Sequence, residues 1–280
     1  MRWLVTGGSG MLGTDLVALL RSRGEDVTST DRDELDITSP AAVDAAVAGY
    51  DVVVNCAAWT AVDAAEAQEP AAFTVNAVGP HLLARACAAA GARLVQVSTD
   101  YVFAGDATEP YAEGDPMTPV SAYGRTKGAG EWAVLAAGDH LVVRTAWLYG
   151  AHGGCFPRTI ARVARERGEL DVVADQVGQP TWTADVAELV VRLVEARAPR
   201  GVYHGTSSGR TSWHGFAQAV VAAAGLDPQI VRPSTSDGLD RAAPRPAFSV
   251  LGHEALRAVG VEPIGDWQER WALAAPTVLG

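Results

Sequence analysis

The stretch Leu4-Val5-Thr6-Gly7-Gly8-Ser9-Gly10-Met11-Leu12-Gly13 passes from a short apolar strand, through regularly spaced glycines, into an amphipathic helix. Glycines in this pattern permit a tight turn, a close approach of backbone to phosphates, and close packing of helix on sheet. The free N–H groups at the helix start favour an anion such as a dinucleotide pyrophosphate. Because a strand precedes the glycines and a helix follows, the motif predicts dinucleotide binding. The predicted cofactor contacts here are Gly7, Gly10, Met11 and Leu12.

Composition narrows the class of protein. The chain has 280 residues, 48% of them hydrophobic, which is enough for a full core. Its net charge is −11 and no basic stripe is evident, so neither nucleic acid nor an anionic membrane is an expected partner. We expect no transmembrane segment and no signal peptide. Cys56, Cys87 and Cys155 match no zinc or disulfide pattern, which favours a cytoplasmic protein.

Strand-like and helix-like segments alternate over the first two thirds of the chain. Strands are expected at 26–30, 51–57, 93–98 and 141–145, with alanine-rich helices such as 41–47 and 82–90 between them. This alternation predicts an α/β fold with a Rossmann-type doubly wound parallel sheet. After about Gly150 glycine, proline and tryptophan become frequent. We therefore expect a dinucleotide-binding domain at 1–150, to which later segments return, and a smaller C-terminal substrate-binding lobe at 151–280.

The end of the second strand bears on the choice of cofactor. Asp31 lies about 20 residues beyond the glycine turn, where an acid hydrogen-bonds the adenosine ribose and favours NAD. Arg32 could pair with the 2′-phosphate of NADP, or it could simply be solvated. We therefore expect either NADH or NADPH. Asp36 and Ile37 could hold the adenine, although a loop acid and a core isoleucine are equally good interpretations.

Tyr123 and Lys127 form the second strong signal. They are four residues apart, so on a helix they share a face. An ammonium beside a phenol lowers the pKa of the phenol, which can then pass a proton to a carbonyl oxygen. The lysine could also hold the nicotinamide ribose. A lone Tyr-x-x-x-Lys is common, but its place on a helix after the fourth strand of a dinucleotide-binding chain predicts catalysis.

Small and polar residues follow two of the predicted strands, at the edge where open parallel sheets bind ligands. After the fourth strand, the Thr99 hydroxyl can donate to a substrate carbonyl and Asp100 can hold a substrate hydroxyl. The alternative is an ordinary polar turn. After the third strand, Ala57 and Ala58 are small enough for a cofactor to lie against the backbone, whereas Cys56 is expected to fill core space.

Longer stretches resemble the dTDP-4-dehydrorhamnose reductase family, within the extended short-chain dehydrogenase/reductase superfamily. They are residues 30–37, 55–66, 98–103, 144–150, 175–181, 201–204 and 245–246. The resemblance covers nearly the whole chain. It implies an oxidoreductase of deoxysugar biosynthesis that uses NADPH or NADH to reduce the C4 ketone of a dTDP-6-deoxy-4-ketohexose.

The same resemblance implies roles for individual residues. Tyr123 would be the proton donor, Lys127 its activator, and Thr99 a hydrogen-bond donor to the carbonyl. Asp100 would lie against the sugar and Trp147 would pack on its face. The remaining implied contacts are Thr60 with the cofactor, and Val62, Asp63, Tyr101 and Arg245 with the substrate. For Arg245, a bidentate contact with the diphosphate competes with the interpretation of a surface arginine pinned by Pro246.

The sequence also departs from the family pattern. Cys155 precedes Phe156 where the family usually has asparagine near the nucleotide sugar, so the sugar preference is open. Some members dimerise through magnesium held by carboxylates. Asp15 and Asp185 stand at two of those positions, without a convincing third acid near the C-terminus. We therefore expect no metal, and either a monomer or a weak homodimer.

Two other functions fit parts of the pattern. A nucleotide-sugar epimerase or dehydratase shares the fold, but dehydratases typically place a glutamate after the aspartate of the strand-four turn, where this chain has Tyr101 after Asp100. A non-catalytic regulatory subunit would tend to lose the tyrosine or the lysine, and this chain has both. The sequence therefore favours the reductase.

Overall fold

A six-stranded parallel sheet forms the core of the computed structural model, which describes residues 1–238 and 240–280. The strand order is β10-β5-β4-β3-β1-β2, and every neighbouring pair is parallel. The strands are β1 (Arg2–Thr6), β2 (Asp26–Thr30), β3 (Val52–Asn55), β4 (Arg93–Thr99), β5 (Leu141–Thr145) and β10 (Gly201–His204). β2 lies on one side of β1 and β3 lies on the other, so the direction in which strands are added changes at β1. This arrangement confirms the predicted Rossmann-type doubly wound sheet.

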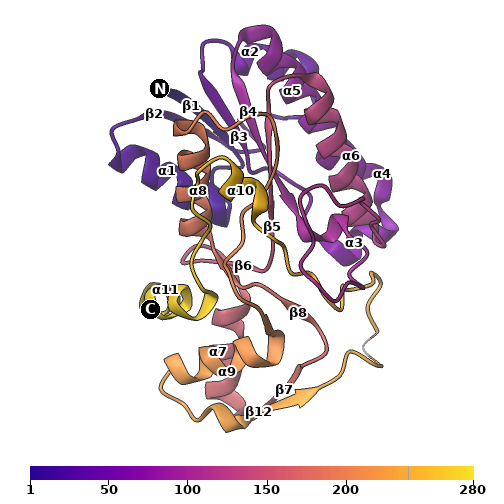
Figure 1. The fold of residues 1–280 in the computed structure, drawn as a ribbon, viewed down its shortest axis with the longest axis vertical. Coiled ribbons are helices and arrows are strands. Elements are labelled where there is room, and N and C mark those ends of the chain that lie inside the picture. The colour runs from indigo at the N-terminus through magenta and orange to yellow at the C-terminus, as the bar shows by residue number, and fades with distance from the viewer. Residues whose placement is uncertain (239) are drawn as a thin grey trace.

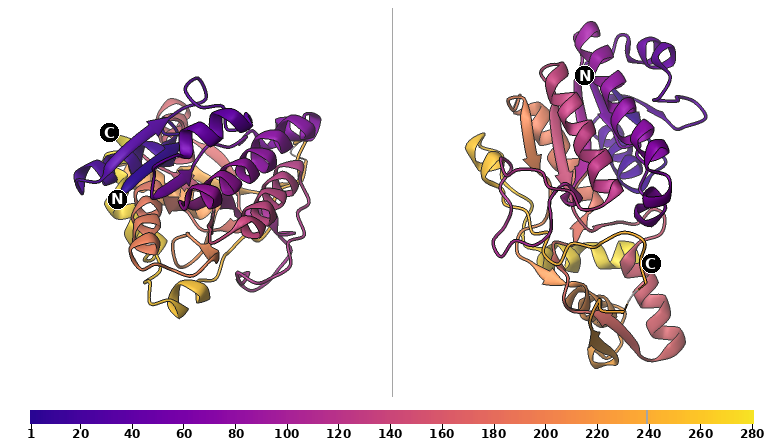
Figure 2. Two further views of the ribbon diagram at one scale, coloured as in Figure 1. Left: turned by 90° about the horizontal axis from the view of Figure 1, so that it is seen from above. Right: turned by 90° about the vertical axis from the view of Figure 1, so that its right-hand side faces the viewer.

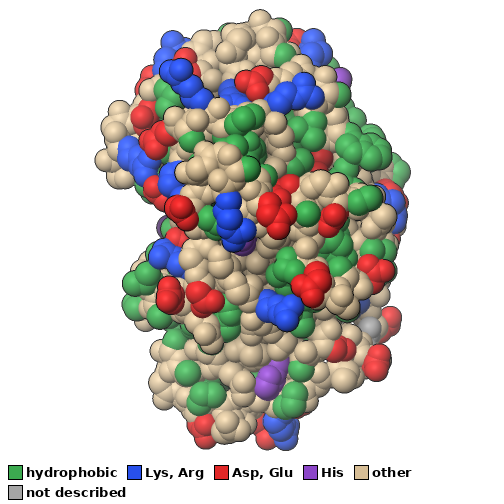
Figure 3. Space-filling model, viewed as in Figure 1, with side chains coloured by type: hydrophobic (Ala, Val, Ile, Leu, Met, Phe, Trp, Pro, Cys, Tyr) green, Lys and Arg blue, Asp and Glu red, His purple; other side chains and the backbone are tan. Residues whose placement is uncertain are grey.

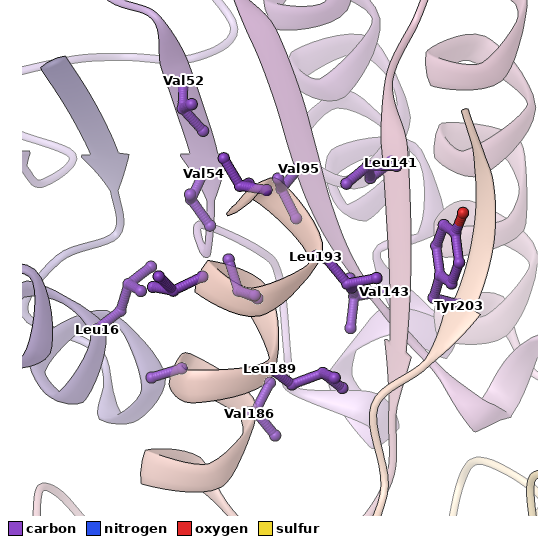
Figure 4. Close-up of a cluster of buried hydrophobic side chains, with 14 of the residues drawn as sticks. Leu16, Val52, Val54, Val95, Leu141, Val143, Val186, Leu189, Leu193 and Tyr203 are labelled. Atoms are coloured by element: carbon purple, nitrogen blue, oxygen red, sulfur yellow. The ribbon is translucent and has the colours of Figure 1, made fainter. Parts of the chain in front are cut away.

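Helices cover both faces of this sheet (Figure 1). One face carries α1 (Met11–Ser22) and α8 (Thr183–Glu195), and the other carries α2 (Pro40–Val47), α5 (Gly79–Ala90) and α6 (Ala122–Ala137). Consecutive strand residues point to opposite faces, so Val52 and Val54 pack under α1 and α8 while Val53 packs under the other helices. Figure 4 shows Val186, Leu189 and Leu193 of α8 against these strands.

Two element boundaries differ from the sequence prediction for physical reasons. The third strand, expected over 51–57, ends at Asn55, because the Ala57 N–H donates to the side-chain oxygen of Asn55 at 3.1 Å. The helix expected over 82–90 begins earlier and has Pro80 in its first turn, where a missing N–H costs nothing. A π-helical segment, Thr74–Val78, leads directly into it.

A smaller lobe lies below the ends of the sheet strands (Figures 1 and 2). It packs α7 (Phe156–Arg167), α9 (Trp213–Ala223) and α11 (Trp267–Leu279) with the paired strands β7 (Leu170–Val173) and β12 (Val231–Ser234). Its core is rich in aromatic side chains, including Tyr149, Phe216 and Trp271. Since α8 and β10 belong to the sheet unit, later segments do return to it. The division at residue 150 stays a prediction.

The remaining elements are short. They are α3 (Val62–Ala67), α4 (Glu69–Phe73), β6 (Leu148–Tyr149), β8 (Val177–Gly178), β9 (Thr181–Trp182), β11 (Thr211–Ser212) and α10 (Glu254–Ala258), with 3₁₀ turns at Asp100–Val102 and Pro228–Ile230.

Residues 241–253, which we call the strap, run between the lobe and the sheet unit. The Phe248 N–H donates to the Gly105 carbonyl at 2.9 Å, and the Ser249 N–H donates to Val177 at 2.9 Å. The Tyr111 N–H donates to Val250. The strap is therefore fixed to both units by backbone hydrogen bonds.

Figure 3 shows basic and acidic side chains interspersed on the face that it draws. Within residues 1–238 and 240–280, each helix is too short or too polar to span a bilayer.

A glycine contact in α6 gives the first prediction. A Cβ at Gly130 would lie 2.1 Å from the Asn76 carbonyl oxygen, whereas a Cβ at Gly128 would make ordinary contacts with the side chains of Met117 at 3.5 Å and Val102 at 3.9 Å. Gly130→Ala should therefore lower the free energy of unfolding by about 1–3 kcal/mol. Gly128→Ala, the matched control on the same helix, should be neutral or stabilise by up to about 1 kcal/mol. Urea denaturation measures both, and equal values for the two variants would contradict the contact.

Candidate active site

The glycine turn between β1 and α1 has the shape that a pyrophosphate needs. Gly7 has a φ of +67°, and a Cβ there would lie 2.7 Å from the Ala57 nitrogen. A Cβ at Gly13 would lie 2.3 Å from the Gly7 carbonyl oxygen. Gly10 is the N-cap of α1, and no side chain among the described residues caps that end of the helix. The first-turn N–H groups can therefore receive an anion, so the turn fits a dinucleotide.

The neighbouring predicted contacts divide between surface and core. Asp31 accepts hydrogen bonds from the Ser9 N–H at 3.1 Å and the Ser9 hydroxyl at 2.8 Å, which ties the end of β2 to the glycine turn. Arg32 is exposed. Hydrogen bonds from the side chain and backbone of Thr38 lower the pKa of the exposed Asp36. Ile37 lies in the hydrophobic core. At the glycine turn itself, Met11 is half-buried and the Leu12 side chain is buried.

Two asparagines that the sequence analysis did not assign to the site hold part of its backbone in place. Asn55, at the end of β3, accepts from the Thr6 hydroxyl at the end of β1 and donates to Gln96 in the middle of β4, linking three neighbouring strands. Asn76, in the π-helical segment, bonds both the N–H and the carbonyl of Trp59. Together they hold the turn after β3, where Ala57 and Ala58 are half-buried and Thr60 is exposed. One sequence signal could have identified Asn55: it is a polar residue directly after the apolar run Val52-Val53-Val54.

Helix α6 carries the predicted catalytic pair against the end of β4. The Ser121 hydroxyl accepts from the Gly124 N–H and caps the helix. A Cβ at Gly124 would lie 2.1 Å from the Tyr101 carbonyl oxygen, so only glycine allows this approach. As a result the rings of Tyr101 and Tyr123 meet edge to face, with centroids 5.5 Å apart. The structure thus brings Tyr123 beside the residues that follow β4.

The electrostatics of the pair differ from the sequence expectation. Desolvation raises the pKa of Tyr123, and the Thr99 hydroxyl acts in the opposite direction. The Lys127 ammonium, expected to lower that pKa, donates instead to the Val97 carbonyl at 2.7 Å. Burial lowers the pKa of Lys127 to about 8. Near neutral pH the phenol is therefore protonated, as a proton donor must be, and the lysine is mostly charged.

Asp100 is buried at the same strand end. Its Oδ1 accepts from the Thr99 hydroxyl at 2.9 Å. Its Oδ2 is buried and has no hydrogen-bond partner within the described part of the chain. Burial raises the pKa of Asp100 to about 6, while the hydroxyls of Ser249 and Thr99 oppose that shift. An unpartnered carboxylate oxygen at a ligand-facing strand end suits a substrate hydroxyl.

A buried ion pair lies one turn beyond Lys127. Glu131 of α6 and Arg144 of β5 are 1% and 3% exposed, with 2.7 Å between Oε2 and a guanidinium nitrogen. A second bond from the Arg144 Nε measures 3.0 Å. Arg144 also donates to the Glu113 carbonyl at 3.3 Å. The pair fixes α6 over β5, and Glu131 raises the pKa of Lys127 against the effect of burial.

Trp147 is held in a strained position. Its φ is +47°, which is unusual for a residue other than glycine. Its ring stacks on Trp213 with centroids 3.6 Å apart and planes 8° from parallel. A Cβ at Gly178 would lie 2.5 Å from the same ring. One face of Trp147 is thus covered by another aromatic ring, and its contact with a sugar stays a prediction.

Asp63 and Arg245, each expected to face the substrate, bond to each other instead. The two guanidinium nitrogens of Arg245 reach the two carboxylate oxygens at 3.0 and 2.6 Å. Asp63 also accepts from the Ala243 N–H at 3.0 Å, so α3 is tied to the strap. Val62, the preceding residue, is half-buried. In this arrangement the guanidinium that was expected on a diphosphate is paired with a carboxylate.

Comparison with known proteins now bears on this site. Residues 1–278 match the family described as RmlD substrate binding domain. A probable dTDP-4,6-dihydroxy-2-methyloxan-3-one 4-ketoreductase of Streptomyces antibioticus is 48% identical across all of this chain and 96% of its own length. A dTDP-4-dehydrorhamnose reductase of Streptomyces griseus is also 48% identical, over 100% and 94%. The chain belongs to the dTDP-4-dehydrorhamnose reductase family.

A solved structure agrees with this assignment. The dTDP-4-dehydrorhamnose reductase of Bacillus anthracis, in complex with NADP, is 36% identical over 98% of each chain, with a TM-score of 0.94. The family and the fold class predicted from the sequence are thereby confirmed.

The departures from the dTDP-4-dehydrorhamnose reductase pattern have structural consequences. Cys155 is buried, and its thiol lies 3.6 Å from the Gly150 carbonyl oxygen. Asp185 pairs with Arg270, whose Nε donates at 2.8 Å, and Asp15 accepts from the Thr183 hydroxyl. The described residues contain no cluster of three or more metal-ligating side chains. The expected absence of a metal stays a prediction.

The raised pKa of Asp100 predicts a pH effect on stability. Because the pKa of Asp100 is raised in the folded protein, this residue favours folding when the pH is below 3.8, its pKa in the unfolded chain. That contribution is lost as the pH rises through about 6, its pKa in the folded protein. Two pKa units correspond to about 3 kcal/mol. Asp100→Asn does not titrate, so its free energy of unfolding relative to wild type should increase by up to about 3 kcal/mol between pH 4 and pH 7.

Urea denaturation of both proteins at several pH values measures this difference. The buried histidines His204 and His253, whose pKa values burial lowers, act equally in both proteins and cancel. A difference that is constant with pH would show that Asp100 is not desolvated in solution.

Proposed function

We propose that this protein reduces the C4 ketone of a dTDP-4-keto-6-deoxyhexose with NADH or NADPH. The observation that carries the proposal is the meeting of Tyr123, Lys127 and Thr99 at the end of β4, beside a glycine turn that fits a dinucleotide. When bound, the nicotinamide supplies the hydride. Gly7, the N-terminus of α1 and Asp31 would hold its dinucleotide portion.

The chain's own residues would manage the proton and the developing charge. Tyr123, protonated because desolvation raises its pKa, gives its proton to the ketone oxygen as that oxygen becomes an alkoxide. Thr99, adjacent to the phenol, would have to turn its hydroxyl from Asp100, to which it donates in this structure, toward the same oxygen. Lys127, anchored on the Val97 carbonyl, places a positive charge nearby and retains further N–H groups for ribose hydroxyls.

Other residues would hold the sugar. The unpartnered Oδ2 of Asp100 accepts a sugar hydroxyl, which also satisfies a buried oxygen. Trp147, immobilised on Trp213, offers a rigid apolar surface for the hexose ring. Val62, the first residue of α3, and Tyr101, whose ring meets that of Tyr123 edge to face, would complete the substrate contacts.

The proposal names a class of substrate rather than one sugar. The two Streptomyces relatives are equally similar to this chain and bear names with different sugars. Cys155, at the position of the family's asparagine, lies in the core of the lobe and gives no hydrogen-bonding amide there. A cytoplasmic location and a monomer or weak homodimer stay predictions from the sequence.

The structure gives no support to the dehydratase alternative. The residue after Asp100 is Tyr101, whose pKa is raised to about 12 by desolvation, so it does not serve as an ionised base.

The role of Tyr123 gives a direct test of the proposed reaction. Tyr123→Phe removes the donated proton and should lower kcat about 10²–10⁴-fold with a dTDP-4-keto-6-deoxyglucose-derived ketosugar and NADPH. Cofactor affinity should change little, because the ring remains. Oxidation of the reduced cofactor, followed by its absorbance, measures the rate, and stereochemical analysis of the product identifies the sugar formed.

Tyr50→Phe is the matched control, because its hydroxyl bonds Thr28 at the sheet edge, far along the chain from α6. It should retain wild-type turnover. Near-normal turnover of Tyr123→Phe would refute the assigned proton donor, and conversion of sugar without net cofactor oxidation would indicate an epimerase or dehydratase.

A further inference from the structure

In the Asp63–Arg245 pair, a carboxylate of the chain itself occupies an arginine that could otherwise bind an anion. Both guanidinium nitrogens of Arg245 are directed to Asp63, at 3.0 and 2.6 Å. The Arg245 side chain is only 14% exposed, whereas Asp63 is 48% exposed. The arginine is therefore held by its surroundings, and the carboxylate reaches it from the solvent side.

The surroundings of Arg245 are rigid. Its Nη1 also donates to the Ala243 carbonyl at 2.8 Å. The next residue, Pro246, packs so closely on Gly105 that a Cβ at Gly105 would lie 2.4 Å from the Pro246 side chain. Backbone hydrogen bonds from residues 247–249, just after Arg245, anchor the strap to Gly105 and Val177. Loss of the Asp63 contact would therefore leave the guanidinium in nearly the same place.

A cavity of about 190 Å³ lies next to the pair. It is lined by Gln176, Ser236, Arg241, Ala243, Pro244 and Arg245. The positive charge of Arg241 also lowers the pKa of Asp63. Asp63 is thus paired with one guanidinium group and lies in the field of a second, so the cavity is lined by two positive charges in a protein whose net charge is −11.

We infer that Asp63 occupies the guanidinium of Arg245 in place of a ligand anion, and that the diphosphate of a nucleoside diphosphate binds by displacing it. The inference rests on the proposed function, which supplies such a substrate. A carboxylate and a phosphate present the same pair of oxygens to an arginine, so they compete for one geometry.

The balance of this competition selects the ligand. An ion pair in which one partner is half exposed contributes little, so a multiply charged diphosphate can replace it. A neutral sugar or nucleoside cannot, because it would leave the guanidinium unpaired. Asp63 is therefore a specificity-determining residue: it weakens binding of the anions that displace it, and it keeps the guanidinium paired when the ligand is uncharged.

Titration calorimetry with dTDP alone tests the inference without catalysis. Asp63→Asn removes the competing charge but keeps an oxygen for the Ala243 N–H, and should lower the Kd for dTDP about three- to fivefold. Arg245→Gln should raise that Kd about tenfold or more. In the Arg245→Gln background, Asp63→Asn should have no further effect, because Asp63 acts through this arginine.

The matched control is Asp171→Asn, which loses an equal charge from an exposed pair with Arg232 in the lobe. It should leave the Kd unchanged, and thermal unfolding of each variant reports its folding. Unchanged or weaker dTDP binding by Asp63→Asn would overturn the inference, as would an equal gain in the Arg245→Gln background. If these contrary binding results are obtained and the wild type nevertheless reduces the ketosugar, this inference fails and the proposed function stands. No binding of dTDP to the wild type would overturn the proposed substrate as well.

Discussion

Helix α6 can present Tyr123 at the end of β4 only because its backbone touches two carbonyl groups. Gly124 faces the carbonyl of Tyr101, and Gly130 faces that of Asn76. Each contact leaves no space for a Cβ, so the distances from α6 to the turn after β4 and to the π-helical segment are set by backbone rather than by side chains. The phenol, the lysine and the strand-four turn are thereby held at fixed separations. A proton donor depends more on such fixed positions than on tight binding of the substrate.

Buried polar groups around this contact are costly, and the site arranges them in pairs. Glu131 and Arg144 compensate each other in the interior, where loss of one partner costs about 3–5 kcal/mol. Asn55 and Gln96 do the same for two neighbouring strands. Ser98 and Asp100 are exceptions, because the Ser98 hydroxyl and one Asp100 oxygen stay without a partner among the described residues. Stability is thus given up at the position where a ligand hydroxyl would restore it.

The sequence predicted those parts of the structure that depend on local pattern. Continuous valine runs indicated buried parallel strands, and the glycine spacing located the turn before α1. The Tyr-x-x-x-Lys spacing placed both side chains on one helix face. It did not predict the π-helical segment that presents Asn76, because no residue type marks such a segment. Nor did it predict the pKa of Tyr123, which depends on how much protein surrounds the phenol and not on its neighbours in sequence.

Pairs of residues distant in sequence were the main gap. Asp63 and Arg245 were each assigned to the ligand, and their sequence separation of 182 residues gave no reason to join them. Asp185 and Arg270 are also distant in sequence; Asp185 was considered only as a metal position and Arg270 was assigned no role. An acidic chain cannot leave arginines near an anion site unpaired without attracting its own carboxylates. The candidate anion sites of this protein are therefore of two kinds: the N-terminus of α1, which no side chain in the described part of the chain caps, and an arginine that is already paired with a carboxylate.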